Sequence, residues 1–315
     1  MKPMIVLTGP TAVGKTKLSI ELAKRINGEI ISADSMQVYK DMDIGTAKVA
    51  PEEMQGIKHY LIDEFEPDED FNVVKFKEYA VKYANEIYAK GKIPIIVGGT
   101  GFYIQALLYD IAFDKNEDDR TYRHELEELA KEKGNSCLYE MLKKVDPKSC
   151  EIIHENNVKR VIRALEFYQQ TGKKISEHNE EQSQNESPYN FAYFVLNHDR
   201  KILYERIDQR VDKMVEDGLL DEVKKLYDAG YGLDLVSMQG LGYKEILKIF
   251  EGDCTFEDAV YTIKRDTRHF AKRQLTWFKR EKDVIWLNKP DFNDDESRIL
   301  EFVVEVLKEK GIFSE

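Results

Sequence analysis

The fold is decided by residues 4–16, MIVLTGPTAVGKT. The apolar run 4–8 is typical of a short buried strand, and residues 9–16 match the pattern G-x-x-x-x-G-K-[ST] in full. Apolar residues then recur at helical spacing until Gly28, which is a stop signal. A strand, a glycine-rich loop and a helix in this order predict a phosphate-binding loop (P-loop).

The chemistry of this loop points to a bound polyphosphate. Its glycines let consecutive backbone N–H groups face phosphate oxygens, and the helix that follows adds about half a positive charge at its N-terminus. Lys15 supplies a point charge, and Thr16 supplies a hydroxyl for Mg²⁺, so Thr16 is the predicted metal ligand. The residues expected to contact phosphate are Gly9, Thr11, Ala12, Val13, Gly14, Lys15 and Thr16.

Further strands and helices alternate after the loop. Short apolar strands are predicted at 29–33, 59–63 and 93–97, and helices at 72–90 and from residue 102. Such alternation favours an α/β fold with a P-loop NTPase-like parallel sheet flanked by helices.

Two polar residues follow predicted strands and are candidates for the site. Asp34 follows 29–33, and Thr100 lies in the cluster Gly-Gly-Thr-Gly after 93–97. The carboxyl ends of parallel strands face the ligand crevice, so both side chains are expected there. The competing interpretation is that each residue only caps a turn or helix.

The usual metal-holding carboxylate of a phosphotransferase is hard to find. It normally ends an apolar strand, but the strand at 93–97 ends in glycines. Asp63 is a weak candidate, because an acidic loop follows it. The loop is therefore expected to bind phosphate without the machinery that transfers it.

Length and composition bound the protein class. A chain of 315 residues with 42% hydrophobic and 34% charged residues reads as globular, with two domains expected. No apolar run approaches the roughly 18 residues of a membrane span, and three scattered cysteines form neither a disulfide framework nor a metal-spaced pair. We expect a cytoplasmic protein with no membrane partner.

Residues 114–187 are predicted to form an all-helical insertion. The remaining segments, 1–113 and 188–315, would form the P-loop core domain. The insertion ends in the polar tract EHNEEQSQNES, at 177–187, which is expected to be a loop or linker.

The charge is unevenly distributed along the chain. The formal net charge is −12, yet residues 264–282 hold eight Lys or Arg against two acids. A helix predicted at 258–280 places these bases on two faces with Trp277 between them. Such a surface suits RNA phosphates and an unstacked base; the alternative is an ordinary solvated helix face.

The chain resembles the tRNA dimethylallyltransferases in blocks that run in order from residue 4 to 280. The blocks are GPTAVGKT (9–16), DSMQVY (34–39), GIKHYLID (56–63), VGGTGFYIQAL (97–107), RVIRALEFYQQTGKKIS (160–176), RIDQRVDKMVEDGLLDEV (206–223), MQGLGYKE (238–245) and RDTRHFAKRQLTWFKR (265–280). Residues 154–157 depart from the family's usual His-Pro-Asn-Asp, and the zinc module of eukaryotic members is missing, which marks the bacterial type.

The resemblance implies transfer of a dimethylallyl group from its diphosphate to the exocyclic amine (N6) of adenine 37, 3′ of the anticodon, in tRNAs that read codons starting with U. It implies Mg²⁺ as cofactor and Asp34, Thr100 and Lys15 as catalytic residues. The P-loop would bind the diphosphate together with Arg206 and Arg210, which lie one helical turn apart. The alternative for these arginines is surface ion pairing with nearby acids.

The tRNA anticodon stem-loop is the expected partner, bound by a monomer without an obligate protein partner. The predicted tRNA-binding residues are Asp34, Ser35, Met36, Gln37, Thr100, Arg123, Lys159, Arg160, Arg163, Gln239, Gly240, Gly242, Tyr243, Lys244, Arg268, Lys272, Arg273 and Trp277. Two other functions stay open at this point: an isopentenyltransferase acting on free adenine nucleotides, and a small-molecule P-loop kinase. An isopentenyltransferase acting on free adenine nucleotides would need neither the insertion nor the basic helix.

Overall fold

The computed structural model describes residues 1–113 and 121–314. The chain divides into two compact units: Met1–Leu108 together with Pro188–Glu315, and Tyr109–Ser187. We call them the core unit and the helical unit. The first boundary falls at Leu108, slightly before the residue 113 that the sequence suggested.

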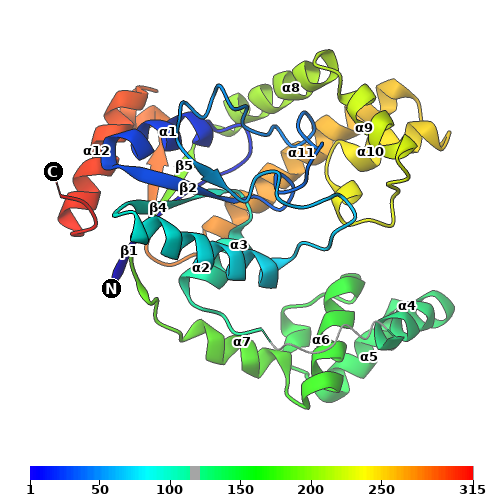
Figure 1. Ribbon diagram of the computed structural model, residues 1–315. Coiled ribbons are helices and arrows are strands. Elements are labelled where there is room, and N and C mark those ends of the chain that lie inside the picture. Colours follow the sequence, from blue (N-terminus) through cyan, green and yellow to red (C-terminus); the bar gives the residue numbers. More distant parts are fainter. Residues whose placement is uncertain (114–120, 315) are drawn as a thin grey trace. The chain divides into compact units, whose positions relative to one another are not determined.

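The core unit is built on a parallel sheet of six strands in the order β3-β2-β4-β1-β5-β6 (Figure 1). This confirms the predicted fold class. The strands are β1 Lys2–Thr8, β2 Gly28–Ala33, β3 His59–Tyr60, β4 Ile93–Gly98, β5 Tyr189–Asn197 and β6 Val284–Asn288. The strand predicted at 59–63 is wrong beyond Tyr60, because Leu61 and Asp63 have φ values of 60° and 56°, which bend the chain out of the extended conformation.

Helices of the core unit lie on both faces of the sheet, except that α9 and α10 pack on other helices. Their bounds are α1 Lys15–Ile26, α2 Val73–Ala89, α3 Gly101–Leu108, α8 Arg200–Glu216, α9 Leu219–Asp228, α10 Tyr243–Phe250, α11 Phe256–Phe278 and α12 Glu296–Glu309, with 3₁₀ turns η2 Ser237–Gln239 and η3 Lys289–Phe292. Helix α2 begins as predicted: the side chain of Asn72 accepts hydrogen bonds from the N–H groups of Val74 and Lys75.

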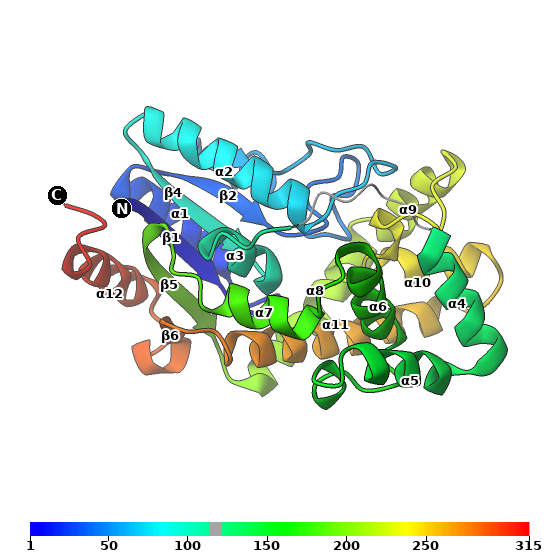
Figure 2. The ribbon, with the colours of Figure 1, turned by 90° about the horizontal axis from the view of Figure 1, so that it is seen from below.

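Different helices cover the two faces of the sheet. On one face, α1 and α12 pack over the sheet (Figure 1). Leu22 of α1 and Leu307 of α12 belong to the same buried core as Phe194 of β5. On the other face, α2 and α3 lie side by side (Figure 2). The rings of Phe76 and Tyr103 stack there, with their centroids 4.7 Å apart. Because both faces are covered, the central strands read as continuous apolar runs.

The carboxyl ends of three strands are held close together. Thr8 of β1 and Ala33 of β2 both pair with Gly98 of β4. A Cβ on Gly98 would lie 2.2 Å from the carbonyl oxygen of Ala33, so this approach requires glycine. The loops that leave these strands therefore converge on one edge of the sheet.

The helical unit consists of α4 Thr121–Lys133, α5 Asn135–Val145, η1 Ser149–Glu151, α6 Val158–Thr171 and α7 Ile175–Ser183. Its own core is formed by apolar side chains of α4, α5 and α6, among them Leu126, Leu142 and Val161. Residues 114–120 of the predicted insertion lie outside the described residues.

The polar tract at 177–187 is largely helical, so the prediction of a loop or linker was wrong. Helix α7 takes in residues 177–183. Glu and Gln are good helix formers, and Lys174 and Lys148 pair with Glu177 and Glu180 on this helix. The low hydrophobicity of this tract is that of a helix at the surface of a bundle, and it does not indicate a loop.

A buried carboxylate fastens α7 to the turn after α5. Asp146 is 1% exposed and accepts hydrogen bonds from the N–H and hydroxyl groups of both Ser149 and Ser176. Burial by itself would raise the pKa of Asp146, but these four donors together hold it below its ordinary value.

No helix within the described ranges is long and apolar enough to cross a membrane.

We predict that Asp146→Asn loosens the helical unit. The amide keeps the size of the side chain but loses acceptor capacity, which should cost about 2 kcal/mol at pH 7. Because the folded pKa is depressed, the stabilisation is present above the unfolded pKa of about 3.9 and is lost as pH falls through the folded pKa. Hydrogen exchange of α5 and α7 amides should report the loosening. A surface control, Lys143→Gln, should leave their protection unchanged, and equal protection in both variants would contradict the prediction.

Candidate active site

The phosphate-binding loop connects β1 to α1, as predicted. Gly9 has a φ of 147°, and a Cβ there would lie 2.2 Å from the carbonyl oxygen of Leu196 in β5. Gly14 has a φ of 99°, and Ala12 between them has a φ of 63°. Val13 is fully buried and anchors the loop in the core. The loop is thus pinned by backbone packing on one side and by a buried side chain on the other.

Lys15 folds back over this loop. Its Nζ donates hydrogen bonds to the carbonyl oxygens of Gly9 at 3.0 Å and Pro10 at 2.9 Å. Burial, reinforced by the nearby charge of Arg210, lowers the pKa of Lys15 to about 7, while Asp34 opposes the shift. A bound anion would supply the negative charge that this ammonium group lacks.

A cavity of about 500 Å³ lies in front of the loop. It is lined by the loop, by the carboxyl ends of β2 and β4, and by α8 and α11. The lining includes predicted site residues and several others: Thr11, Ala12, Gly14, Lys15, Thr16, Lys17, Ile20, Glu21, Asp34, Gln37, Thr46, Ala47, Glu53, Gln55, Val97, Gly98, Gly99, Arg210, Phe270 and Gln274. Phosphate-binding groups and the acid Asp34 therefore share one cavity.

Asp34 and Thr100 leave neighbouring strands and lie close in the fold. The N–H of Thr100 donates to the carbonyl oxygen of Ala33 at 3.2 Å, which places Thr100 beside Asp34 in the chain path. Asp34 also caps its own turn, because its Oδ1 accepts from the N–H groups of Met36 and Gln37. Asp34 lines the cavity, whereas Thr100 is outside the lining set. The capping interpretation thus holds for Asp34 alongside its place at the cavity.

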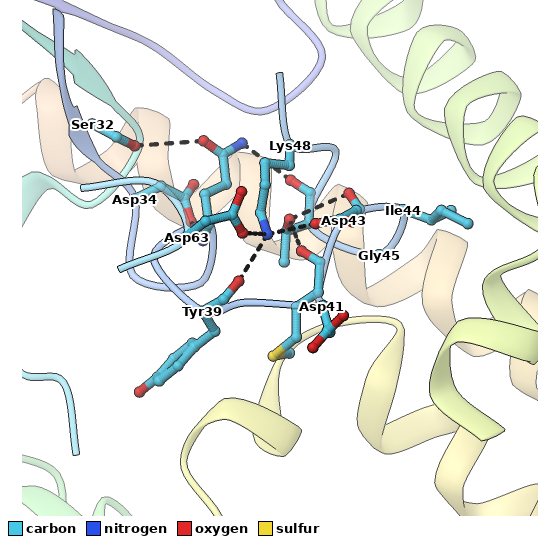
Figure 3. A network of polar contacts seen from close by, with 12 residues as sticks. Ser32, Asp34, Tyr39, Asp41, Asp43, Ile44, Gly45, Lys48 and Asp63 are labelled. Atoms are coloured by element: carbon cyan, nitrogen blue, oxygen red, sulfur yellow. Dashed lines mark hydrogen bonds and ion pairs between the residues drawn. The ribbon is translucent and has the colours of Figure 1, made fainter. Parts of the chain in front are cut away.

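The loop after Asp34 is held by two side chains. Gln37 donates from Nε2 to the carbonyl oxygens of Thr46 and Ala47. Lys48, whose side chain is 5% exposed, donates to the carbonyl oxygen of Tyr39 and pairs with Asp43 and Asp63 (Figure 3). Asp63, the one weak candidate for a phosphotransferase metal ligand, is therefore engaged by a lysine.

The two arginines of α8 have different surroundings. Arg210 lines the cavity, where desolvation lowers its pKa. Arg206 is not among the lining residues. Two of the acids expected to pair with them are taken by α11, since Asp208 pairs with Arg268 and Asp212 with Lys264. This geometry fits a phosphate contact for Arg210, and the contact of Arg206 stays a prediction.

The predicted residues at 239–244 are mostly structural. Tyr243 is fully buried, and its hydroxyl donates to Glu222 at 2.6 Å. Gly240 and Gly242 are buried as well, and a Cβ on Gly240 would meet Cε of Met36 at 2.6 Å. On this segment Gln239 is exposed and Lys244 is half-buried. Ser35, next to Met36, is also half-buried.

The basic helix α11 is partly neutralised by acids that are distant in sequence. Arg268 pairs with Asp208 of α8, so part of its charge is already neutralised. Lys272 and Arg273 are exposed. Trp277 packs over Gly101, where a Cβ would meet the indole at 2.3 Å, so the ring serves packing and is not splayed for a base.

In the helical unit, α6 carries an exposed basic surface formed by Lys159, Arg160 and Arg163. Arg123 differs from these three, because its guanidinium donates to both oxygens of the buried Glu166 at 2.9 and 2.7 Å. This bidentate pair joins α4 to α6.

Sequence reasoning missed Gln274 and Phe270, which line the cavity from α11. The sequence does contain a signal for Gln274. It lies at helical spacing from Ala271 and Phe278, which are buried, and so falls on the same side of the helix. A polar residue on an apolar stripe is expected to have a specific hydrogen-bond partner.

The oxygen atoms that line the cavity suit a metal cation that binds together with an anionic substrate. Across residues 1–113 and 121–314, no group of three His, Cys, Asp or Glu side chains could hold a metal. Thr16 and Asp34 nevertheless line the same cavity. Mg²⁺ usually keeps several waters and takes one or two protein ligands plus substrate phosphates, and the Thr16 hydroxyl would be one such ligand.

A family model for IPP transferases matches residues 37–281. The chain belongs to this family. It is 66% identical over 312 residues to the tRNA dimethylallyltransferase of Lachnoclostridium phytofermentans, covering 99% of both chains. It is 54% identical to the enzyme of the same name from Acetivibrio thermocellus, covering 99% of this chain and 100% of the relative.

The fold agrees with a solved member of the family. The structure is similar to the crystal structure of the tRNA isopentenylpyrophosphate transferase of Bacillus halodurans, with a TM-score of 0.74 and 45% identity over 99% of this chain and 98% of that one. The family resemblance inferred from the ordered sequence blocks is confirmed.

We predict that binding of an alkyl diphosphate at pH 8 takes up a proton at Lys15. The free enzyme holds this lysine with a pKa of about 7, so it is mostly neutral at pH 8. A bound anion raises the pKa and recharges the group. Calorimetry in two buffers of different ionisation enthalpy should show uptake approaching about one proton. In Lys15→Arg, which is always charged, the uptake should vanish; equal uptake in both proteins would assign the proton elsewhere.

Proposed function

We propose that this chain is a tRNA dimethylallyltransferase. It transfers the dimethylallyl group of dimethylallyl diphosphate to N6 of adenine 37 in tRNAs that read codons starting with U, and it releases diphosphate. The observation that carries the proposal is the cavity that joins a complete phosphate loop to the carboxylate of Asp34. Family membership and the names of the close relatives support the substrate class.

The phosphate loop serves the leaving group. When the bond between the dimethylallyl carbon and its oxygen breaks, negative charge builds on the diphosphate. Lys15, Arg210 and the N–H groups at the start of α1 face that charge from the cavity wall. Fixed donors stabilise the transition state without reorganisation. A divalent cation, held by Thr16 and the phosphates, would neutralise part of the same charge.

Asp34 serves the nucleophile. An adenine amine is a poor nucleophile, since its lone pair is delocalised into the ring. As the new N–C bond forms, a carboxylate that accepts the amine proton accelerates the step by about 10²–10⁴-fold. Asp34 has one oxygen committed to its turn, and we assign proton acceptance to its other oxygen, with Thr100 as a second polar contact to the adenine.

The tRNA-binding surface rests on a few exposed cations, because the net charge is −12. We assign contacts to Lys272 and Arg273 on the core unit, and to the α6 surface of Lys159, Arg160 and Arg163 on the helical unit. Local cations can bind an acidic RNA to an acidic protein because each neutralised phosphate releases counterions. We place the enzyme in the cytoplasm as a monomer, in keeping with its three free cysteines.

The transfer assay tests the whole proposal. The purified protein, incubated with dimethylallyl diphosphate, Mg²⁺ and unmodified tRNA, should yield N6-(dimethylallyl)adenosine on digestion, detected by mass. Asp34→Asn should lower the rate by about 10²-fold or more and leave tRNA affinity unchanged. A matched control, Asp41→Asn in the same loop, should stay near wild type. Modification of free AMP in place of tRNA, or phosphate transfer from ATP, would contradict the proposal.

Charge reversal tests the RNA surface. Lys272→Glu with Arg273→Glu should weaken tRNA binding and make its salt dependence shallower, by about 0.7 in log–log slope for each lost single-strand contact. Binding of dimethylallyl diphosphate should be nearly unchanged. Lys308→Glu with Lys310→Glu on α12 changes the net charge equally and should leave the slope as in wild type. If the two double variants behave alike, α11 does not contact the RNA.

A further inference from the structure

Gln274 connects the phosphate loop to the glycine cluster after β4. It lies on α11, is 6% exposed, and uses both ends of its amide. Its Oε1 accepts from the N–H of Thr11 at 2.9 Å, and its Nε2 donates to the carbonyl oxygen of Gly99 at 3.0 Å. One side chain thus spans the two loops that carry Lys15 and Thr100.

The orientation of this amide is fixed by its partners. A flipped amide would set NH₂ against the N–H of Thr11 and oxygen against the carbonyl of Gly99, so both contacts would be repulsive. Gly99 is also shaped for this contact, because a Cβ there would lie 2.1 Å from Nε2. Only glycine at 99 lets the amide reach the backbone.

The bridge has a consequence for the phosphate cradle. Pro10 has no N–H, and the N–H of Thr11 is directed to Gln274. Residues 10 and 11 therefore offer no backbone N–H to a phosphate. The predicted diphosphate contact of Thr11 is accordingly limited to its side chain, which lines the cavity.

We propose that Gln274 is a positioning residue that fixes the distance between the leaving-group site and the adenine amine. The inference rests on the proposed function. The phosphate loop sets where the diphosphate lies, and Thr100, adjacent to Gly99, borders the position assigned to the adenine. Transfer needs the reacting atoms within about 3–3.5 Å, and a misplacement of about 1 Å can cost about 10²-fold in rate. Loss of the bridge lets the two half-sites separate while each still binds its own ligand.

The decisive test is Gln274→Glu across pH. A carboxylate still accepts from Thr11 but repels the carbonyl of Gly99, whereas a protonated carboxyl restores both bonds. Burial and the facing carbonyl raise its pKa from the ordinary Glu value of about 4.3, while Lys15 and Arg210, which line the same cavity, act against the rise. Relative to wild type at the same pH, single-turnover transfer should be about 10²-fold slower at pH 8 and should recover toward wild type near pH 6.

Gln274→Met is the matched control. It is of similar size and makes neither bond, so its transfer should be slow at every pH. Dissociation constants for dimethylallyl diphosphate and for tRNA, measured separately, should change by less than about threefold in Gln274→Met, which adds no charge to the cavity. A purely structural role would lower both affinities and thermal stability together and would give no recovery in acid.

Gly99→Ala keeps the inference testable if the glutamate variant does not fold. Its added methyl group displaces the amide without altering Gln274, and combining it with Gln274→Met should add little further loss. Normal transfer in Gln274→Met, additive losses in the double variant, or no acid recovery in a folded Gln274→Glu would overturn the inference. Failure of the wild type to modify tRNA would instead overturn the proposed function.

Discussion

The site depends on the close approach of backbone at the carboxyl edge of the sheet. Gly98 lies against the carbonyl of Ala33, and Gly9 against that of Leu196, at separations that admit no side chain. These contacts bring the ends of β1, β2, β4 and β5 together, so that the phosphate loop, the turn at Asp34 and the Gly99 loop surround one cavity. Their glycines are needed for space in both cases, and at Gly9 for a positive φ as well.

The electrostatics of the cavity suit a ligand that brings its own negative charge. Lys15 is half-buried and lies near Arg210. Asp34 acts on the charge of Lys15, and Glu53 acts on that of Arg210. Because of this balance, Lys15 is partly neutral in the free protein, and a bound diphosphate would favour its charged form. Asp63 is engaged by Lys48 and does not line the cavity, so Asp34 is the carboxylate that follows a strand there.

Ion pairs between helices decide which basic residues are free to contact RNA. Helix α8 supplies Asp208 and Asp212 to Arg268 and Lys264 of α11. These pairs fix α11 against the core, and they leave Lys272 and Arg273 as exposed cations beside the buried Gln274. The helix that presents charge outward is thus also the helix that holds the two loops of the cavity in register.

The sequence alone determined the phosphate loop, the parallel sheet, the positions of Asp34 and Lys15, and the family, because each depends on local spacing that survives in any context. Tertiary structure decided the rest. Tyr243 and Trp277 carry functional-looking chemistry, but neighbours distant in sequence bury the first and pack the second on Gly101. The polar tract at 177–183 became a helix through ion pairs that a linear pattern does not contain. Gln274 gained its role only because α11 crosses the loops after β1 and β4, which lie more than a hundred residues away in the chain.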